Sequence, residues 1–287
     1  MGREIISFDY AMKYILRQKS NFDILEGFLS DLLGEDIIIN EILESEGNQD
    51  RDDAKLNRVD LIAKDSKGTK LIIEIQYNRE NDYLERILWE TSKAIVESLD
   101  KADPYEKIVK VISINILYFN LGKGEGYVYK GATNFKDIGT PESQKPLKLA
   151  RNIFPEYYLI NVERFKNVIN TPLDEWIYMF RNSKVPESPK AKHMDKVQEK
   201  LDILKMSSQE KKAYEYHLKE TKIYKSVLKS KRDEGKAEGR LEGRLEGKAE
   251  ALLEMARKLL AKGMDFEFIS ETTGLSIEEI EKLKVGK

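Results

Sequence analysis

The residues best suited to chemistry lie in two short stretches, one on each side of a polar turn. Asp60 lies in the run Arg58-Val59-Asp60-Leu61, and the second stretch reads Glu74-Ile75-Gln76. Between them lies the turn 65–68, Asp-Ser-Lys-Gly, flanked on both sides by alternating apolar and polar residues. Such a pattern predicts a β-hairpin that brings the two stretches side by side.

The turn fixes the expected register of this hairpin. A three-residue loop over 66–68, with Gly68 left-handed, makes Asp60 face Glu74 and Arg58 face Gln76. A one-residue shift would mix polar and apolar side chains, which supports this register. The opposite face is then entirely apolar, comprising Val59, Leu61, Ala63, Leu71, Ile73 and Ile75.

Opposed carboxylates on a hairpin need a cation or a proton between them. Directly facing residues have Cβ atoms roughly 4.5–5.5 Å apart, and like charges there are destabilising. A divalent metal would neutralise Asp60 and Glu74, polarise a phosphoryl oxygen and activate water. The alternative is a solvated strand face on which Arg58 and nearby lysines balance the charge. A retaining glycosidase would use a pair about 5–5.5 Å apart, but no aromatic-rich sugar cleft is apparent.

Composition excludes several other kinds of site. The 287 residues include no cysteine, which rules out disulfides, thiol catalysis and cysteine–zinc sites. The two histidines, His193 and His217, come late in the chain, so the first half holds neither a Ser-His-Asp triad nor a multi-histidine metal site. A metal here would be a hard ion held by oxygen, such as Mg²⁺ or Mn²⁺.

The global charge and hydropathy point to no membrane partner. Lys and Arg number 49 against 51 Asp and Glu, for a formal charge of −2. Any nucleic-acid surface must therefore be a local patch. No apolar stretch approaches the roughly 18 residues of a membrane span. We expect a cytoplasmic protein.

The hairpin is embedded in a regular order of expected elements. That order is helix, strand, strand, strand, helix, strand, which predicts an α/β (α+β) core. The helix after the hairpin carries a capping box, Asp82 with Glu85, and an apolar face that includes Leu84 and Leu88. The expected elements are a helix over 22–33 ended by Gly34, a strand over 37–43, the hairpin strands 58–64 and 70–76, the helix from 82, a buried strand over 108–119, and further strands near 127–129 and 157–162.

These motifs resemble the PD-(D/E)XK nuclease superfamily, and more closely its Rpn-type recombination-promoting nuclease/putative transposase family. The resemblance covers most of the chain. It rests on the hairpin motif, Asp9-Tyr10-Ala11-Met12-Lys13, Tyr83-Leu84-Glu85-Arg86, the Gly-Arg-Leu-Glu repeat and Thr273-Gly274-Leu275-Ser276. It implies a restriction-endonuclease-like αβββαβ core and a metal-dependent DNA endonuclease associated with recombination or transposition, in a nucleoid-associated location. The alternative is a catalytically inactive DNA- or protein-binding module that retains the fold.

The resemblance also implies roles for single residues. Asp60 and Glu74 would hold Mg²⁺ (or Mn²⁺ or Ca²⁺), and Gln76 takes the place of the superfamily's lysine. An amide can orient water but carries no charge, so more of the chemistry would depend on the metal. Val59 also replaces the Asp that precedes the first ligand in the broader motif.

Further site candidates come from neighbouring elements. Arg86 could contact a DNA phosphate, or it could form an i,i+4 pair with Glu90 on the wet face of its helix. Arg58 is the other candidate for DNA binding. The candidates for a third acidic ligand are Glu26, Glu41 and Glu44.

The C-terminal part has a different composition. The stretch 183–190 predicts a linker between a nuclease-like domain, 1–185, and a charged helical tail, 190–287. Residues 235–250 read GKAE-GRLE-GRLE-GKAE, so glycines recur every fourth residue beside a basic row. This repeat would join copies of the chain into a homo-oligomer, contact DNA, or form a flexible charged tether.

The end of the tail, 264–287, predicts a short helical hairpin. Its Thr-Gly-Leu-Ser turn suits a helix-turn-helix. Its second helix is acidic, with Glu278, Glu279 and Glu281, which favours a structural cap or partner-binding unit over a DNA reader.

Overall fold

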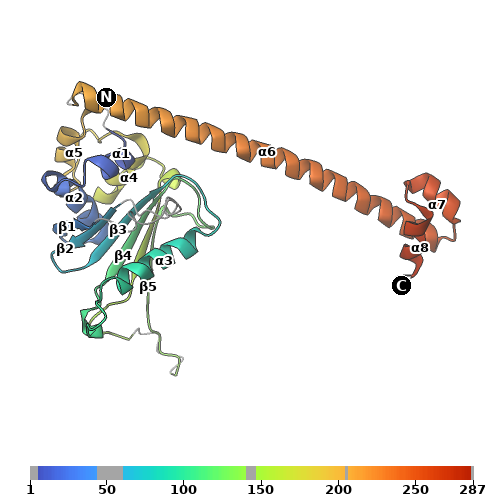
Figure 1. Ribbon diagram of the computed structural model, residues 1–287, viewed down its shortest axis with the longest axis horizontal. Coiled ribbons are helices and arrows are strands. Elements are labelled where there is room, and N and C mark those ends of the chain that lie inside the picture. Colours follow the sequence, from blue (N-terminus) through green and yellow to red (C-terminus); the bar gives the residue numbers. More distant parts are fainter. Residues whose placement is uncertain (1–5, 44–60, 140–146, 204–205, 286–287) are drawn as a thin grey trace. The chain divides into compact units, whose positions relative to one another are not determined.

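The computed structural model describes residues 6–43, 61–139, 147–203 and 206–285. The chain divides into two compact units, Met1–Tyr214 and Glu215–Lys287. The first unit contains the sheet, and the second is helical (Figure 1). The boundary falls later than the linker expected at 183–190, because Ala191, Met194, Val197 and Leu201 pack into the core of the first unit.

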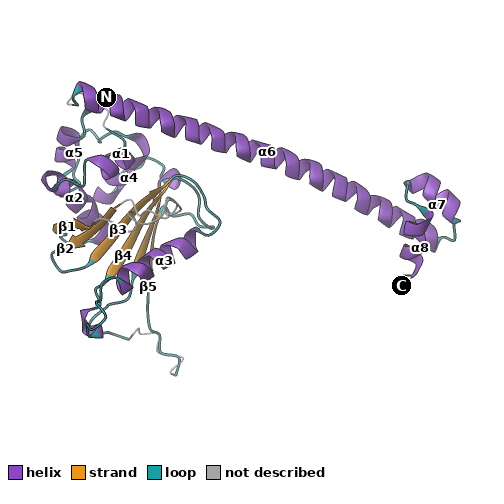
Figure 2. Cartoon of the chain, viewed as in Figure 1, coloured by secondary structure: helices purple, strands orange, loops and turns teal. Residues whose placement is uncertain are grey.

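One six-stranded sheet forms the centre of the first unit, in the order β1-β2-β3-β4-β6-β5 (Figure 2). β3 pairs with β4, and β4 with β6, in parallel, whereas the other neighbours are antiparallel. The strands are β1 (Ile39–Leu43), β2 (Leu61–Asp65), β3 (Lys70–Gln76), β4 (Val111–Leu117), β5 (Val128–Ala132) and β6 (Glu156–Asn161). With the surrounding helices, this mixed sheet confirms the predicted restriction-endonuclease-like α/β class.

The predicted hairpin register is confirmed along the described part of β2. Leu61 faces Ile73, and Ile62 faces Ile72. The loop is closed by the Asp65 amide, which donates to the Thr69 carbonyl at 3.0 Å. Gly68 has a φ of 84°, the left-handed value that the three-residue loop requires.

The two faces of the sheet pack against different helices. The main core lies on one face, where side chains of β2, β3 and β4 meet α1 (Phe8–Tyr14), α2 (Phe22–Leu33), α4 (Pro172–Asn182) and α5 (Met194–Lys200). The other face is covered by α3 (Tyr83–Val96), through contacts such as Ile72 with Ala94 and Val111. Glu74 and Gln76 belong to this second face, because side chains alternate along β3.

The predicted apolar face of α3 is only partly correct. Ile87 and Thr91 of this helix are buried, but Leu84 and Leu88, which were expected on the buried face, are 52% and 57% exposed. The helix turns Tyr83 and the polar Glu90 toward the sheet instead. The predicted capping box is wrong as well, since Asp82 is the N-cap but its side chain makes no capping hydrogen bond.

The second unit consists of helices. It includes most of α6 (Ser208–Ala261), a single helix of 54 residues that also carries the whole repeat 235–250. α7 (Phe266–Thr273) and α8 (Ile277–Val285) pack with the end of α6 around Ala256, Ile269 and Ile280. No helix in the described ranges has the length and apolar character to cross a membrane.

Close packing of α2 against the chain near residue 192 requires a glycine. Asp31 of α2 accepts from the Trp176 indole at 2.8 Å and from the Lys192 amide at 3.1 Å, which draws both segments onto the helix. A Cβ at Gly27 would lie 2.2 Å from the Lys192 carbonyl oxygen and 3.0 Å from Trp176 Cζ2. Only a residue without a side chain fits here.

We therefore expect Gly27→Ala to lower the free energy of unfolding by about 1–3 kcal/mol, since the backbone must shift to admit the methyl group. Urea unfolding measures this. Gly131→Ala is the matched control, because its Cβ would meet Tyr157 at an ordinary 3.6 Å. An equal, small effect of the two substitutions would contradict the close approach.

Candidate active site

Glu74 is a buried acid on the face of the sheet that α3 covers. Only 4% of its side chain is exposed, and its register neighbour on β4 is the fully buried Asn115. The alternative of a solvated strand face is therefore wrong for Glu74. Asp60 and Arg58, and with them the expected pairings to Glu74 and Gln76, lie outside the described residues.

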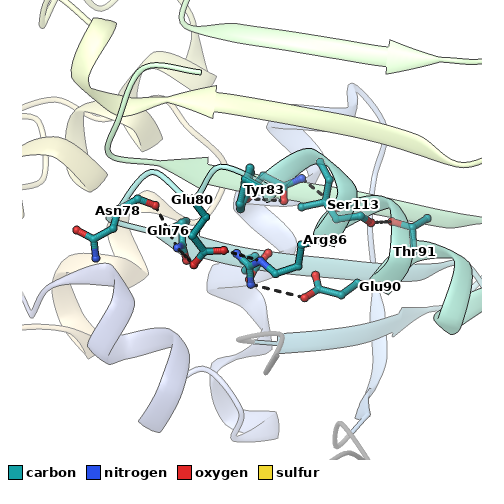
Figure 3. A network of polar contacts seen from close by, with 11 residues as sticks. Gln76, Asn78, Glu80, Tyr83, Arg86, Glu90, Thr91 and Ser113 are labelled. Atoms are coloured by element: carbon teal, nitrogen blue, oxygen red, sulfur yellow. Dashed lines mark hydrogen bonds and ion pairs between the residues drawn. The ribbon is translucent and has the colours of Figure 1, made fainter. Parts of the chain in front are cut away.

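Arg86 of α3 projects toward the sheet (Figure 3). There it contacts Glu74. Its Nη1 donates to Glu74 Oε1 at 2.5 Å and lies 3.6 Å from Glu90 Oε1. The i,i+4 pair with Glu90 thus exists, but not on a wet face. The Arg86 and Glu90 side chains are 12% and 5% exposed, so both lie beneath α3.

Glu80 connects Arg86 to Gln76. It lies between β3 and α3, and its Oε2 is 3.1 Å from Arg86 Nε. Its Oε1 accepts a hydrogen bond from Gln76 Nε2 at 2.7 Å, and the same amide is 3.2 Å from the Asn78 carbonyl oxygen. Figure 3 shows the resulting network, in which Gln76 and Arg86 share one carboxylate.

Burial and charge act in opposite directions on Arg86. Burial disfavours its charged form, but Glu74, Glu90 and Glu80 outweigh this effect and raise the pKa of the guanidinium above its ordinary value. The guanidinium carbon also lies 5.0 Å from the centre of the Tyr83 ring, close enough for a cation–π contact. Arg86 is therefore firmly in its charged form.

Tyr83 fixes the first turn of α3 beside Glu74. Its hydroxyl donates to Asn115 Oδ1 at 2.8 Å. Burial, followed by the charge of Glu74, raises the pKa of Tyr83 above its usual range, so the hydroxyl remains a donor. Asn115 in turn donates to Ser113 Oγ at 3.0 Å, which joins α3 and β4 through a buried polar chain.

The structure does not bring the described candidates for a third acid to Glu74. Glu26 lies on α2, under the other face of the sheet, and accepts from the Ile39 amide at 2.9 Å. Glu41 pairs with Lys64 at 3.3 Å. In the sheet register, Glu41 pairs with Lys64 of β2, which pairs with Lys70 of β3. Lys70 and Glu74 are four residues apart, so Glu41 lies about 13 Å from Glu74 along the strand direction. Glu44 lies outside the described residues.

No pattern in the sequence marks Glu80 and Glu90 as neighbours of Glu74. They converge only because α3 packs over β3, a contact that local patterns do not encode. Asn115 did carry a signal, since a lone amide between Ile114 and Ile116 in a buried strand needs polar partners. Those partners prove to be Tyr83, Ser113 and the Tyr158 carbonyl.

The donor types suit a hard divalent ion. Three carboxylates around one guanidinium give an oxygen-rich, negatively charged environment, which Mg²⁺ and Mn²⁺ prefer. Within the described ranges, however, no group of three acidic or histidine side chains has the arrangement of a metal site. Glu74 is thus one metal-ligand candidate that the structure describes, and Asp60 remains a candidate from the sequence.

A surface pocket of about 510 Å³ adjoins this network. It shares Glu80 and Tyr83 with the network and is also lined by Arg79 and Lys123, which lie on the loops after β3 and β4. Its lining also includes a second acid, Glu85, so two basic and two acidic side chains balance and the pocket's charge favours neither an anion nor a cation.

Two family models match different parts of the chain. Residues 249–285 match the model of the Rpn/YhgA-like nuclease family, C-terminal HTH domain. This match supports the helix-turn-helix interpretation of the chain end over the structural cap that the acidic second helix favoured. No curated protein and no solved structure matches the chain.

The larger match covers the sheet and its helices. Residues 6–231 fit the model described as PD-(D/E)XK nuclease family transposase, which agrees with the mixed sheet flanked by helices. The chain therefore belongs to the PD-(D/E)XK nuclease family transposases, of the Rpn type.

Proposed function

We propose that this protein is a divalent-metal-dependent endonuclease that hydrolyses phosphodiester bonds of DNA in recombination or transposition. The observation that carries the proposal is Glu74, a carboxylate buried between β3 and α3 in a member of a nuclease family. Burying an acid costs free energy, and the pair with Arg86 offsets that cost here. A position of this kind is typical of a functional group rather than of a surface residue.

Each of the three hairpin residues has a distinct role in this proposal. Asp60 and Glu74 hold Mg²⁺, with Mn²⁺ or Ca²⁺ as substitutes. The ion supplies Lewis-acid polarisation of the phosphate and a more acidic water. Gln76 orients the attacking water through its amide. Arg58 is the proposed DNA-contacting residue of the domain, whereas the guanidinium of Arg86 is engaged by Glu74 and Glu80.

The alternative function is a binding module that retains the fold without turnover. One observation favours it: Gln76 stands in place of lysine, and its amide nitrogen is engaged by Glu80 at 2.7 Å. A neutral side chain held in this way cannot stabilise developing negative charge. The module would bind DNA or protein through the same face.

Two further partners follow from the second unit. We assign DNA to the helix-turn-helix formed by α7 and α8 with the end of α6, supported by its family match. We assign a second copy of the chain to the repeat of α6. Residues 235–250 are all exposed, and a Cβ at any of the repeat glycines, Gly235, Gly239, Gly243 and Gly247, would meet nothing within 4 Å.

The glycine row explains why a second copy suits this helix. Each glycine costs up to about 1 kcal/mol in a helix interior, so a solitary solvated helix gains nothing from it. A second helix can approach a row of glycines closely, and the acidic row of one copy can then face the basic row of the other. We expect the protein to be a homo-oligomer through α6.

We expect Glu74→Gln to reduce Mg²⁺-dependent cleavage of supercoiled plasmid by about 100-fold or more, because the neutral isostere weakens metal binding. Unfolding curves show whether the variant is folded. Glu97→Gln, at an exposed carboxylate following α3, is the matched control and should leave cleavage unchanged. Cleavage that survives either EDTA or Glu74→Gln would contradict a metal site at this residue, and no cleavage with any of the three ions would favour the binding module.

Substituting leucine for both Gly239 and Gly243 should dissociate the oligomer, measured by sedimentation velocity. Leucine favours the helix by about 1 kcal/mol per site, so a loss of association would report lost close approach rather than melting. Leucine at Ser226 and Ser230, which have the same spacing upstream, is the control. An unchanged sedimentation coefficient in the glycine variant would contradict association through the repeat.

A further inference from the structure

Arg86 is shared by three carboxylates that come from different parts of the fold. Glu74 belongs to β3, Glu80 to the segment after it, and Glu90 to α3 itself. The contacts with Arg86 are 2.5 Å for Glu74, 3.1 Å for Glu80 and 3.6 Å for Glu90. The shortest contact is thus made with the residue that we assign to the metal.

A guanidinium in this place competes with a metal ion. Nη1 of Arg86 bonds Glu74 Oε1, one of the two oxygens through which this carboxylate could hold a cation. Two positive groups on one buried carboxylate repel each other strongly, because the interior screens charge poorly. Arg86 therefore has to loosen its contact with Glu74 when a divalent ion binds there.

Glu80 is the partner that can receive Arg86. Its side chain is 41% exposed and belongs to a loop, whereas Glu74 is fixed within the sheet. It contacts Arg86 through Oε2 and Gln76 through Oε1. If Arg86 bonds Glu80 more strongly, the Glu80 carboxylate becomes less mobile. Its hydrogen bond with the Gln76 amide is then held more firmly as well.

We propose that Arg86 is a positioning residue that neutralises Glu74 before metal binding and is passed to Glu80 when a divalent ion takes its place. This inference rests on the metal site of the proposed function. Glu80, by holding both Arg86 and Gln76, couples metal occupancy to the orientation of Gln76. Neither Arg86 nor Glu80 touches the metal in this scheme.

The scheme makes the two residues act on metal affinity with opposite signs. Removing the charge of Arg86 removes the competitor, so the metal binds more tightly. Removing the charge of Glu80 takes away the receiving partner, so Arg86 stays on Glu74 and the metal binds less tightly. Such opposite effects are the signature of a linked equilibrium.

The experiment is calorimetric titration of the full chain with Mn²⁺, together with melting curves with and without the ion. We expect Arg86→Gln to lower the Mn²⁺ dissociation constant by about tenfold and Glu80→Gln to raise it severalfold. Arg86→Lys keeps the positive charge, on a single ammonium group. Its Mn²⁺ dissociation constant should lie between those of wild type and Arg86→Gln. Glu97→Gln is the control and should match wild type.

Stability adds a readout that does not depend on turnover. Arg86→Gln removes a partner of Glu74 and Glu90, so it should melt lower without metal and recover more on adding Mn²⁺ than wild type does. If Arg86→Gln does not fold, two other variants still test the scheme. The Mn²⁺ dissociation constant should fall in Arg86→Lys and rise in Glu80→Gln.

The outcomes separate this inference from the proposed function. Mn²⁺ binding by wild type that is lost in Glu74→Gln, with equal affinities in all Arg86 and Glu80 variants, overturns the inference and leaves the metal site intact. No Mn²⁺ binding by wild type overturns both. A fall in affinity in the Arg86 variants also overturns it, because Arg86 would then support the metal rather than compete with it.

Discussion

The contact between Arg86 and Glu74 is the interaction on which the arrangement of the site depends. A carboxylate on the inner face of a sheet can stay charged only with a counterion, and α3 supplies one at 2.5 Å. This requirement explains why a helix that could bury Leu84 and Leu88 instead turns Arg86 and Glu90 toward the strands. The need of Glu74 for a counterion therefore determines which side of α3 packs against the sheet.

The connection from β3 through α3 to β4 determines where this contact forms. The antiparallel hairpin of β2 and β3 leads into a parallel pairing of β3 with β4, and α3 is the crossover between those parallel strands. The crossover must cross one face of the sheet, so its first turn lies over the end of β3. Tyr83 fixes that turn to Asn115 of β4. Glu80, in the short loop before it, lies within reach of both Gln76 and Arg86.

Local patterns in the sequence predicted the hairpin well and the site only in part. The register of β2 and β3 followed from Gly68 and strict alternation, both of which are properties of neighbouring residues. The pair of Arg86 with Glu90 also followed from spacing on one helix. Its burial did not, because that depends on which side of α3 meets the sheet, and the exposed leucines of this helix mislead any prediction based on hydrophobicity. The convergence of Glu74, Glu80 and Glu90 arises from tertiary packing alone.

The central claim is that Glu74 exchanges a guanidinium for a divalent ion. Anomalous diffraction at the manganese edge, from crystals of the protein grown with Mn²⁺, tests it most directly. The account predicts an anomalous peak at the Glu74 carboxylate, with the Arg86 guanidinium moved away from Glu74 and bonded to Glu80. Crystals in which Arg86 still bonds Glu74, with no peak at that carboxylate, would contradict it.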